Sequence, residues 1–407
     1  MKRKGLALLL LLSLGACRHP DIEYLDFETF KVLSVNYSHV VQNGNLNPEV
    51  ALMGDTELDA EPDTKVASTQ AATLVRDLLG SIHSRRLVHI AGQFKGHDID
   101  GSPMAQSGKL ILPESGPIKN IILVSHYTIG ANYECPSQTF PFEGIFADKG
   151  YAVIIADYIG FGITADRIHP YMHTESTARS VVDMALAVKP YLQHIGRAPE
   201  SEEVILFGYS QGGSTTMAVM DLIQDEYPTE FPLKQVYAGG GPYDLAATFD
   251  YSMETGITGI PCAIPMIVQG VNEGERLGLD MEAFFKDRLL ENYKEWINSK
   301  KYTVKQINQQ IASKDLRDIM TDAGRDRSHG ETAVLYKALL KNSTLNFTPR
   351  APIYLFHSRT DQTVPFVNAE RAEAHFKGRD IRYDFGDYGK HSVGCIRFIL
   401  TAYKDLP

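Results

Sequence analysis

The sequence contains little cysteine, no basic block beyond its first residues and no second long apolar run. Its 407 residues include four cysteines, spaced too widely for the ligand pairs of a zinc site. Lysine and arginine number 40 against 50 aspartates and glutamates, so the formal charge is −10. An acidic chain without a basic patch is not expected to bind nucleic acid. With 43% hydrophobic and 22% charged residues, the composition is typical of a soluble globular protein.

The amino-terminal residues are typical of an export signal. "MKRKG" is basic, "LALLLLLSL" is apolar but too short to cross a bilayer, and Gly15 and Ala16 precede Cys17. Small residues directly before a cysteine resemble the lipobox of bacterial lipoproteins, in which that cysteine is acylated. We therefore predict a signal peptide over 1–16 and lipid attachment at Cys17. The mature protein would be extracytoplasmic and anchored to a bacterial membrane, on its periplasmic or cell-surface face.

The other three cysteines leave two arrangements open. Cys135 and Cys262 both fall in expected loops near the active site, and an exported protein can join such a pair in a disulfide. The alternative is three buried thiols, because cysteine is among the most buried residue types and Cys395 lies in an apolar helical pattern. We predict the disulfide between Cys135 and Cys262. Neither arrangement includes a metal site.

The chain divides into an irregular lead and a regular body. Residues 17–65 are rich in Asn, Asp, Glu and Pro, and we expect a lipidated tether and a loosely packed lead there. After residue 66, helical stretches alternate with short buried runs, which read "NIILVSHY", "YAVIIADY", "EVILFGY", "KQVYAGGG", "PIYLFHS" and "IRYDFGD". This alternation predicts an α/β fold with a mostly parallel, twisted sheet and helices on both faces.

One long interval, residues 246–348, has helical patterns but no buried strand run. In an open α/β sheet such an insertion lies at the carboxyl end of a strand, the edge where ligands bind. We therefore predict a helical cap over the active site, between a first part of the core at 66–245 and a second part at 349–407. An independent helical domain away from the site is the alternative.

The stretch "VILFGYSQGGSTTMAVMDLI" places Ser210 between two glycines. A serine nucleophile needs a base, donors for the oxyanion and a turn that exposes its oxygen. Gly208 and Gly212 lack Cβ atoms where a strand reverses sharply into a helix, with Tyr209 completing the turn. The motif alone occurs by chance, but a buried strand before it and a helix after it are the setting of a nucleophile elbow. The pattern predicts that Ser210 is a nucleophile.

The base and the acid are expected after later strands, in the order serine, acid, histidine. Asp361 lies in "HSRTDQTVPF", just past the strand "PIYLFHS", and His391 lies in "FGDYGKHSVG", past the strand "IRYDFGD". His391 would take the serine proton as general base, and Asp361 would orient the imidazole. Asp384 and Asp387 stay open as alternative acids. His357 is the rival base, although its place inside a strand is more typical of a core histidine.

The order of "GYSQGG", "SRTDQTVP" and "KHSVG" resembles that of the α/β-hydrolases, over the body from about residue 70 to the end. "HYTIG" at 126, "ADYIGFG" at 156, "GYSQGG" at 208 and "AGGGPYDL" at 238, with a helical insertion following, resemble the secretory lipase family and related bacterial esterases. The resemblance implies hydrolysis of carboxylic esters through an acyl-enzyme, with no cofactor. The substrate would be a lipid, a small ester or an acylated glycan, and the oligomeric state is not indicated.

The resemblance also implies where the oxyanion donors lie. One is the backbone N–H of Gln211, directly after the nucleophile. The other comes from the loop after "NIILVSHY", where the N–H of Tyr127 is the first choice and that of Thr128 the second. The sequence departs from the lipase pattern here, because Tyr127 and Thr128 directly follow His126 where that pattern has glycines. His126, Thr128 and Tyr158 are further candidates for substrate binding.

Two other functions remain open. A peptidase of the prolyl oligopeptidase type shares the fold and the triad, but the amino-terminal stretch is too short for a β-propeller and shows no repeat of about 40 to 50 residues. A non-catalytic binding lipoprotein on a hydrolase scaffold is the other alternative, because fold alone does not fix function. A scaffold, however, has no need to keep Ser210, Asp361 and His391 together.

Overall fold

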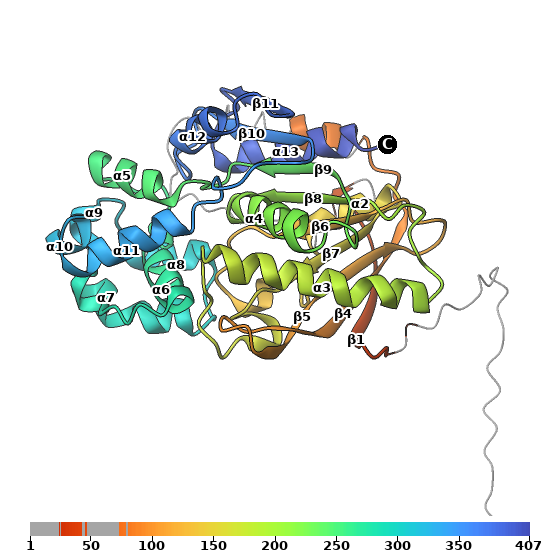
Figure 1. Ribbon diagram of the computed structural model, residues 1–407, viewed down its shortest axis with the longest axis horizontal. Coiled ribbons are helices and arrows are strands. Elements are labelled where there is room, and N and C mark those ends of the chain that lie inside the picture. Colours follow the sequence, from red (N-terminus) through yellow and green to blue (C-terminus); the bar gives the residue numbers. More distant parts are fainter. Residues whose placement is uncertain (1–23, 25, 43–44, 47–72, 79) are drawn as a thin grey trace, which may run out of the picture.

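The computed structural model describes residues 24, 26–42, 45–46, 73–78 and 80–407. The predicted signal peptide and Cys17 therefore lie outside the described residues. The centre is a nine-stranded sheet with the order β1-β4-β5-β7-β6-β8-β9-β10-β11 (Figure 1). Its strands are β1 (Phe30–His39), β4 (Arg86–His97), β5 (Pro103–Pro113), β6 (Ile121–Ser125), β7 (Ala152–Ala156), β8 (Val204–Tyr209), β9 (Leu233–Gly239), β10 (Ile353–Ser358) and β11 (Ile381–Gly386). A small separate sheet pairs β2 (Val41–Gln42) with β3 (Asn45–Leu46).

Most of the sheet is parallel, which confirms the predicted fold class. The pairs β1·β4, β4·β5 and β5·β7 are antiparallel. Every pair from β7 through β6, β8, β9 and β10 to β11 is parallel. The carboxyl ends of these strands therefore share one edge. The chain order reverses at β6, which lies between β7 and β8, and such a switch point opens a crevice for ligands.

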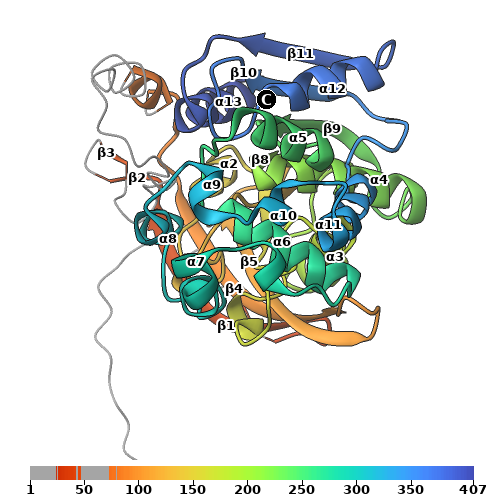
Figure 2. The ribbon, with the colours of Figure 1, turned by 90° about the vertical axis from the view of Figure 1, so that its left-hand side faces the viewer.

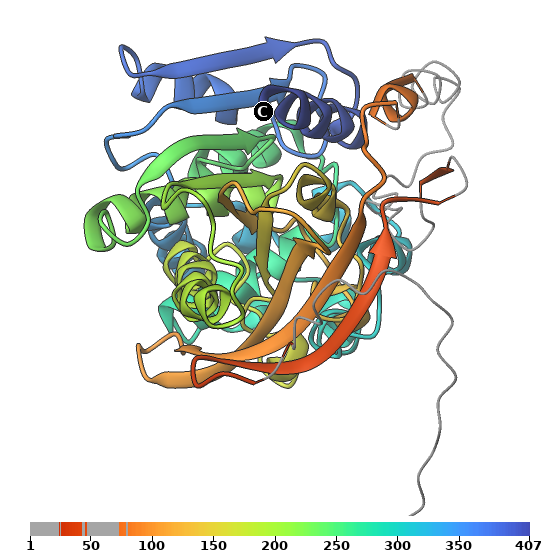
Figure 3. The same ribbon diagram turned by 90° about the vertical axis from the view of Figure 1, so that its right-hand side faces the viewer.

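Helices cover both faces of the sheet, because the strand residues are apolar on both sides. Leu123 and Leu206 belong to one apolar cluster with residues of α3 and α4, while Val124 and Phe207 belong to a second cluster with residues of α2 and α13. Figure 3 shows the yellow-green and green helices α3 and α4 on one side of the sheet and the blue α13 on the other. The core helices are α2 (Ile145–Asp148), α3 (Thr174–His194), α4 (Gln211–Glu226), α12 (Val367–His375) and α13 (His391–Asp405), and residues 73–78 are also helical.

Strand β1 lies at the sheet edge, where the sequence pattern predicts a loose lead. The structure differs from that expectation, because these ten residues pair antiparallel with β4. Phe30 is fully buried, and a Cβ built on Gly92 would lie 2.1 Å from its ring. Most other β1 residues are exposed or half-buried. The strand therefore lacks the apolar alternation by which a sequence reveals one.

Between β9 and β10 the chain forms a group of helices that we call the insert, residues 245–341. Phe284, Trp296 and Ile307 belong to an apolar cluster that consists mostly of insert residues and also includes Tyr171 and Met172 from the loop after β7. The insert gathers beside one end of the sheet (Figure 1) and faces the viewer in Figure 2. Its α-helices are α5 (Leu245–Thr255), α6 (Ala263–Glu275), α7 (Asp287–Tyr293), α8 (Val304–Ile311), α9 (Leu316–Ile319), α10 (Asp322–Arg325) and α11 (Gly330–Lys341).

Short helical turns complete the described elements. The 3-10 turns are η1 (Asn132–Glu134), η2 (Phe142–Gly144), η3 (Gly162–Thr164) and η4 (Met281–Ala283), and η5 (Lys294–Asn298) is a π-helix. Within the part of the chain that the structure describes, the helices lack the combination of length and apolar character that a membrane crossing needs.

Candidate active site

Ser210 lies at the sharp turn between β8 and α4. Its backbone has φ 61° and ψ −127°, a conformation that non-glycine residues rarely adopt and that costs free energy. The turn is held from both sides, because the N–H of Ser210 donates to Gly239 O at 2.9 Å and its own carbonyl accepts from Gly213 N at 2.9 Å. The serine itself is only half-buried. The turn therefore presents the Ser210 hydroxyl at the carboxyl edge of the sheet.

The glycines of the motif allow backbone segments to touch. A Cβ on Gly208 would lie 2.2 Å from Gly212 O, and one on Gly212 would lie 2.0 Å from Ser125 O at the end of β6. Gly213, which follows the motif, is equally restricted, since its Cβ would lie 2.4 Å from Gly239 O. The first turn of α4 thus packs directly on the ends of β6 and β9.

Substituting Gly212 by alanine is expected to lower the free energy of unfolding by at least about 2 kcal/mol, because the new methyl group would force backbone atoms apart. Urea denaturation of the purified protein measures this change. Gly80→Ala is the matched control, since its Cβ would meet only Arg76 O at 3.5 Å and Asp77 O at 3.7 Å. A Gly212→Ala protein as stable as the Gly80→Ala protein would contradict the close packing of the elbow.

An acid and a histidine lie together after the last two strands. Asp361 follows β10, His391 opens α13 after β11, and the distance from His391 Nδ1 to Asp361 Oδ2 is 2.6 Å. The other carboxylate oxygen of Asp361 accepts the N–H groups of Thr363 at 2.8 Å and Val364 at 2.9 Å. These bonds fix the carboxylate, which in turn orients the imidazole and leaves its Nε2 as the proton acceptor.

The histidine packs against the elbow. Tyr209, the residue before Ser210, donates its hydroxyl to His391 O at 2.8 Å, and the two rings have centroids 4.9 Å apart. Within the described residues, the Nε2 atom of His391 is buried and has no hydrogen-bond partner. Because Nδ1 faces Asp361, this unengaged Nε2 is the ring nitrogen available to accept a proton.

Asp361 stays ionised although it is almost fully buried. Burial by itself raises the pKa of a carboxyl group, but the charge and hydrogen bond of His391 and the nearby His357 outweigh this effect, so the pKa of Asp361 is lowered. A carboxylate in this position stabilises the imidazolium that forms when His391 takes a proton.

The alternative acids and the alternative base are engaged elsewhere. Asp384 accepts the hydroxyl of Tyr354 at 2.5 Å and also that of Tyr388, and Asp387 is exposed. His357 is fully buried inside β10, and its Nε2 donates to the carbonyl of Val364 at 3.0 Å. Burial lowers the pKa of His357. Through its bond to Val364, His357 supports the loop that carries Asp361.

Gln211 opens α4 and is almost fully buried. Its side-chain Nε2 lies 3.1 Å from His169 Nε2, and His169 Nδ1 lies 2.7 Å from Ile159 O. Burial lowers the pKa of His169 to about 3, so the ring is neutral, donates through Nδ1 and accepts the amide N–H of Gln211. Sequence reasoning missed His169, because a histidine in the loop after β7 carries no pattern that links it to the elbow.

The other predicted site residues lie at the ends of β6 and β7. The rings of His126 and Tyr158 stack with centroids 4.0 Å apart, and both side chains are buried. Thr128 is also buried, and its hydroxyl lies 2.7 Å from Tyr171 Oη. Tyr127 is half-buried beside them. All four residues therefore lie close together at the ends of β6 and β7. The side chains of His126, Thr128 and Tyr158 contact other protein groups there.

The predicted disulfide between Cys135 and Cys262 is wrong. Cys135, Cys262 and Cys395 are free, buried thiols. Cys135 packs in a small cluster with Ile129 and Phe161, whereas Cys262 belongs to the apolar cluster of the insert. Each thiol fills space in a different apolar environment, as the alternative of three buried thiols proposed.

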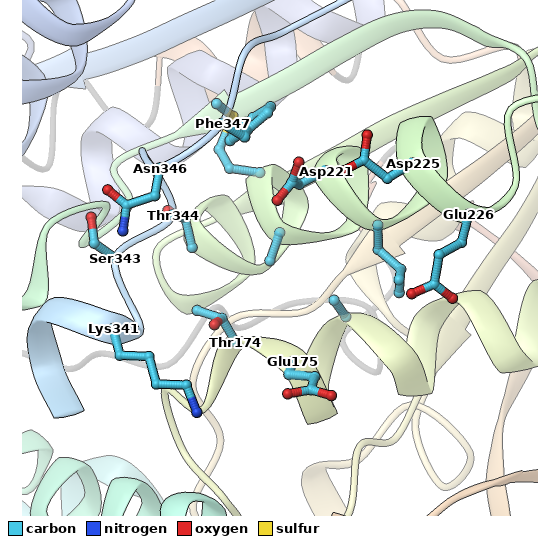
Figure 4. A pocket seen from close by; sticks show the side chains of 14 residues that line it. Thr174, Glu175, Asp221, Asp225, Glu226, Lys341, Ser343, Thr344, Asn346 and Phe347 are labelled. Carbon is cyan, nitrogen blue, oxygen red and sulfur yellow. The ribbon is translucent and has the colours of Figure 1, made fainter. Parts of the chain in front are cut away.

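A groove beside α4 has a mainly acidic lining (Figure 4), and neither Ser210, Asp361 nor His391 belongs to that lining. It lies between α3, α4 and the segment after α11, and its charged lining comprises Glu175, Asp221, Asp225, Glu226 and Lys341. Burial and the neighbouring Asp225 raise the pKa of Asp221. Across the described ranges, no cluster of three or more histidine, cysteine, aspartate or glutamate side chains is arranged to hold a metal ion.

Comparison with known protein families shows to which family this chain belongs. The family model described as secretory lipase matches residues 145–387, which is more than half of the chain and includes Ser210 and Asp361. The chain belongs to the secretory lipase family. Membership indicates a secreted carboxylic ester hydrolase. No curated protein sequence gives a significant match.

Solved structures share the α/β-hydrolase fold of this secretory lipase. The rice cell wall degrading esterase LipA from Xanthomonas oryzae is 23% identical with a TM-score of 0.69, over 84% of this chain and 92% of that one. A putative hydrolase from Legionella pneumophila is 21% identical with a TM-score of 0.73, over 92% and 97%. Candida antarctica lipase A in its closed state is 19% identical with a TM-score of 0.57, over 75% and 73%. Identities this low support the fold alone.

Proposed function

We propose that this secretory lipase is a serine esterase that cleaves carboxylic esters through an acyl-enzyme on Ser210. The observation that carries the proposal is the 2.6 Å contact between His391 Nδ1 and Asp361 Oδ2. This contact leaves Nε2 of a histidine that packs on Tyr209 free to accept a proton beside the elbow. These positions support the assignment of Ser210, His391 and Asp361 as a Ser-His-Asp triad.

The proposed reaction begins when His391 Nε2 takes the proton of Ser210 and the serine oxygen attacks the ester carbonyl. The backbone N–H groups of Gln211 and Tyr127, with Thr128 as the second choice, stabilise the resulting oxyanion. The imidazolium then gives its proton to the leaving alcohol, while Asp361 stabilises its charge. Water activated by His391 releases the acyl group in the same way. No step in this scheme requires a cofactor.

We also infer that the insert, which corresponds to the predicted cap at 246–348, covers the active site. Its chain touches the loops that follow β6 and β7. The carbonyl of Lys300 accepts the N–H of Asn132 at 2.8 Å, and a Cβ on Gly130 would lie 2.5 Å from Tyr302 O. Backbone contacts this close support a cap rather than an independent domain.

The export signal over 1–16 and the lipid on Cys17 form part of the proposal and rest on the sequence alone. They would hold the enzyme at a membrane surface through the tether. A lipid, a small ester and an acylated glycan are the candidate substrates. Membership of a lipase family supports the first of these.

A substrate panel on the wild-type protein tests the proposed function. We expect turnover of 4-nitrophenyl esters, graded from acetate to palmitate, and no cleavage of an Xaa-Pro anilide, because an ester bond has the better leaving group. Faster cleavage of the anilide would favour the peptidase. Tight binding of a lipid or glycan without turnover of any ester or amide would favour the non-catalytic alternative.

A further inference from the structure

Lys300 belongs to the insert and is fixed on the loop that follows β6. It lies between η5 and α8, and its carbonyl accepts the N–H of Asn132 at 2.8 Å. Its backbone has φ 56°, a left-handed conformation that is strained for a lysine. Such strain persists where the surroundings hold the residue in place, and it concentrates at functional sites.

The side chain of Lys300 is buried without a counter-ion. Its exposed fraction is 6%, and its Nζ lies 5.2 Å from the centroid of the Phe161 ring. In the described parts of the chain, no carboxylate forms an ion pair with Lys300. Burial lowers its pKa to about 8. An ammonium that is removed from water without a partner anion is costly, and a bound anion would relieve the cost.

Lys109 is a second buried lysine of this protein, and it has a hydrogen-bond acceptor. It is 2% exposed, and burial lowers its pKa to about 8, as it does for Lys300, although the charge of Asp157 acts in the opposite direction. The difference lies in the contacts, since Lys109 Nζ donates to the carbonyl of Thr139. Lys300 has the comparable burial without the carbonyl acceptor or the nearby carboxylate. The contrast makes Lys300 a candidate for ligand recognition.

The ammonium lies on the Gln211 side of the active site. Phe161 separates it from His169, since the Phe161 and His169 rings have centroids 5.0 Å apart. His169 in turn bonds the side chain of Gln211 at 3.1 Å. After burial, the charge of Lys300 is the largest effect that lowers the pKa of His169. Lys300 is therefore linked to the Gln211 side chain through Phe161 and His169, and its charge acts on His169.

We propose that Lys300 is a specificity-determining residue that binds a carboxylate group carried by the ester substrate. The proposal rests on the proposed function, because the recognised group must belong to an ester that reaches Ser210. One ammonium, separated by the Phe161 ring from a neutral histidine, supplies a single positive charge, which matches a carboxylate better than a phosphate. The enzyme would thus favour esters of dicarboxylic acids or of carboxylated alcohols over their neutral counterparts.

Two matched ester pairs test this preference. The first compares 4-nitrophenyl hemisuccinate with 4-nitrophenyl valerate, and the second compares the butyrate esters of 4-hydroxybenzoate and 4-hydroxybenzamide. We expect Lys300→Met to lower kcat/KM for the anionic member of one pair by roughly 10- to 100-fold, the range of a hydrogen bond to a charged group. The neutral esters should change by less than about threefold. Lys301→Met is the control, because Lys301 is exposed and pairs with Glu295 at 3.0 Å.

The pH dependence in the wild type gives a second readout. Lys300 loses its proton as the pH rises through about 8, so the preference for anionic esters should be full at pH 6.5 and decline above pH 8. If Lys300→Met does not fold, the wild-type protein is tested instead, by comparing how strongly glutarate and butyrate inhibit hydrolysis of the valerate ester. Stronger inhibition by glutarate that declines above pH 8 supports the proposal. Equal inhibition by the two acids overturns it.

The outcomes separate this inference from the proposed function. Equal losses for anionic and neutral esters in Lys300→Met would show a structural role and overturn the inference. The inference would also be overturned if the ratio of kcat/KM between the anionic and the neutral ester were unchanged in both pairs. Both results leave ester hydrolysis by the wild type intact. Failure of the proposed function would instead appear as a wild-type protein that cleaves none of the four esters.

Discussion

Ser210→Ala is expected to lower kcat for hydrolysis of 4-nitrophenyl butyrate by about 10⁶-fold, because the acyl-enzyme cannot form without the hydroxyl. A residual rate above that of water should survive, since the oxyanion donors and the substrate contacts are unchanged. The turn itself already holds Ser210 at φ 61°, so alanine meets the same backbone strain as serine and the fold should persist. Steady-state kinetics and thermal denaturation of both proteins check these points.

Ser214→Ala is the matched control for Ser210→Ala. Ser214 lies one turn further along α4, and its buried hydroxyl makes a long 3.4 Å contact with that of Thr344. The control should keep kcat within a few-fold of wild type. A Ser210→Ala enzyme with more than a tenth of the wild-type kcat would exclude Ser210 as the nucleophile.

His391→Ala is expected to lower kcat by a similar factor of about 10⁶, because neither the hydroxyl of Ser210 nor the leaving alcohol then has its proton-transfer partner. The two residues act as one unit, so the double variant with Ser210→Ala should be hardly less active than either single variant. A comparison of kcat for the two single variants and the double variant measures this coupling.

His375→Ala serves as the control for His391→Ala, since His375 is an exposed residue of α12. Its kcat should equal that of the wild type. Losses that multiply in the double variant of Ser210 and His391 would mean that the two side chains act in separate steps, and the triad would have to be abandoned.

The residues proposed for the triad could be predicted because each lies within a few residues of the end of a strand. A buried run ends one residue before Ser210, and another ends shortly before Asp361. His391 stands a few residues beyond β11. Parallel strands bring their carboxyl ends to one edge, so chain order and spacing were enough to expect these residues at that edge, and the structure shows Asp361 in contact with His391 there.

Other features depend on contacts that no local pattern records. His169 holds Gln211 across 42 positions of the sequence, and the loop that carries it has neither periodicity nor a motif. Strand β1 was not predicted because most of its side chains are exposed to solvent. The disulfide was expected from the loop positions of Cys135 and Cys262, but loop position says nothing of which apolar cluster encloses each thiol.

The insert also has features that its sequence pattern does not reveal. Its helices are evident from their apolar spacing, whereas the burial of Lys300 against Phe161 arises only when the segment after η5 packs on the loops of the core. Gly130 permits that approach, since any larger residue would meet the carbonyl of Tyr302. The feature proposed to select a substrate thus arises from tertiary packing, whereas the residues proposed to cleave an ester follow from the order of the strands.

The most direct test of the central claim is to treat the wild-type protein with a fluorophosphonate and to locate the adduct by mass spectrometry of its peptides. Such probes react with a serine only where a base and an oxyanion hole activate it. We expect one phosphonate per chain, attached to Ser210, with loss of esterase activity in proportion to labelling. An adduct on another residue, or full activity in a protein labelled at Ser210, would contradict the account.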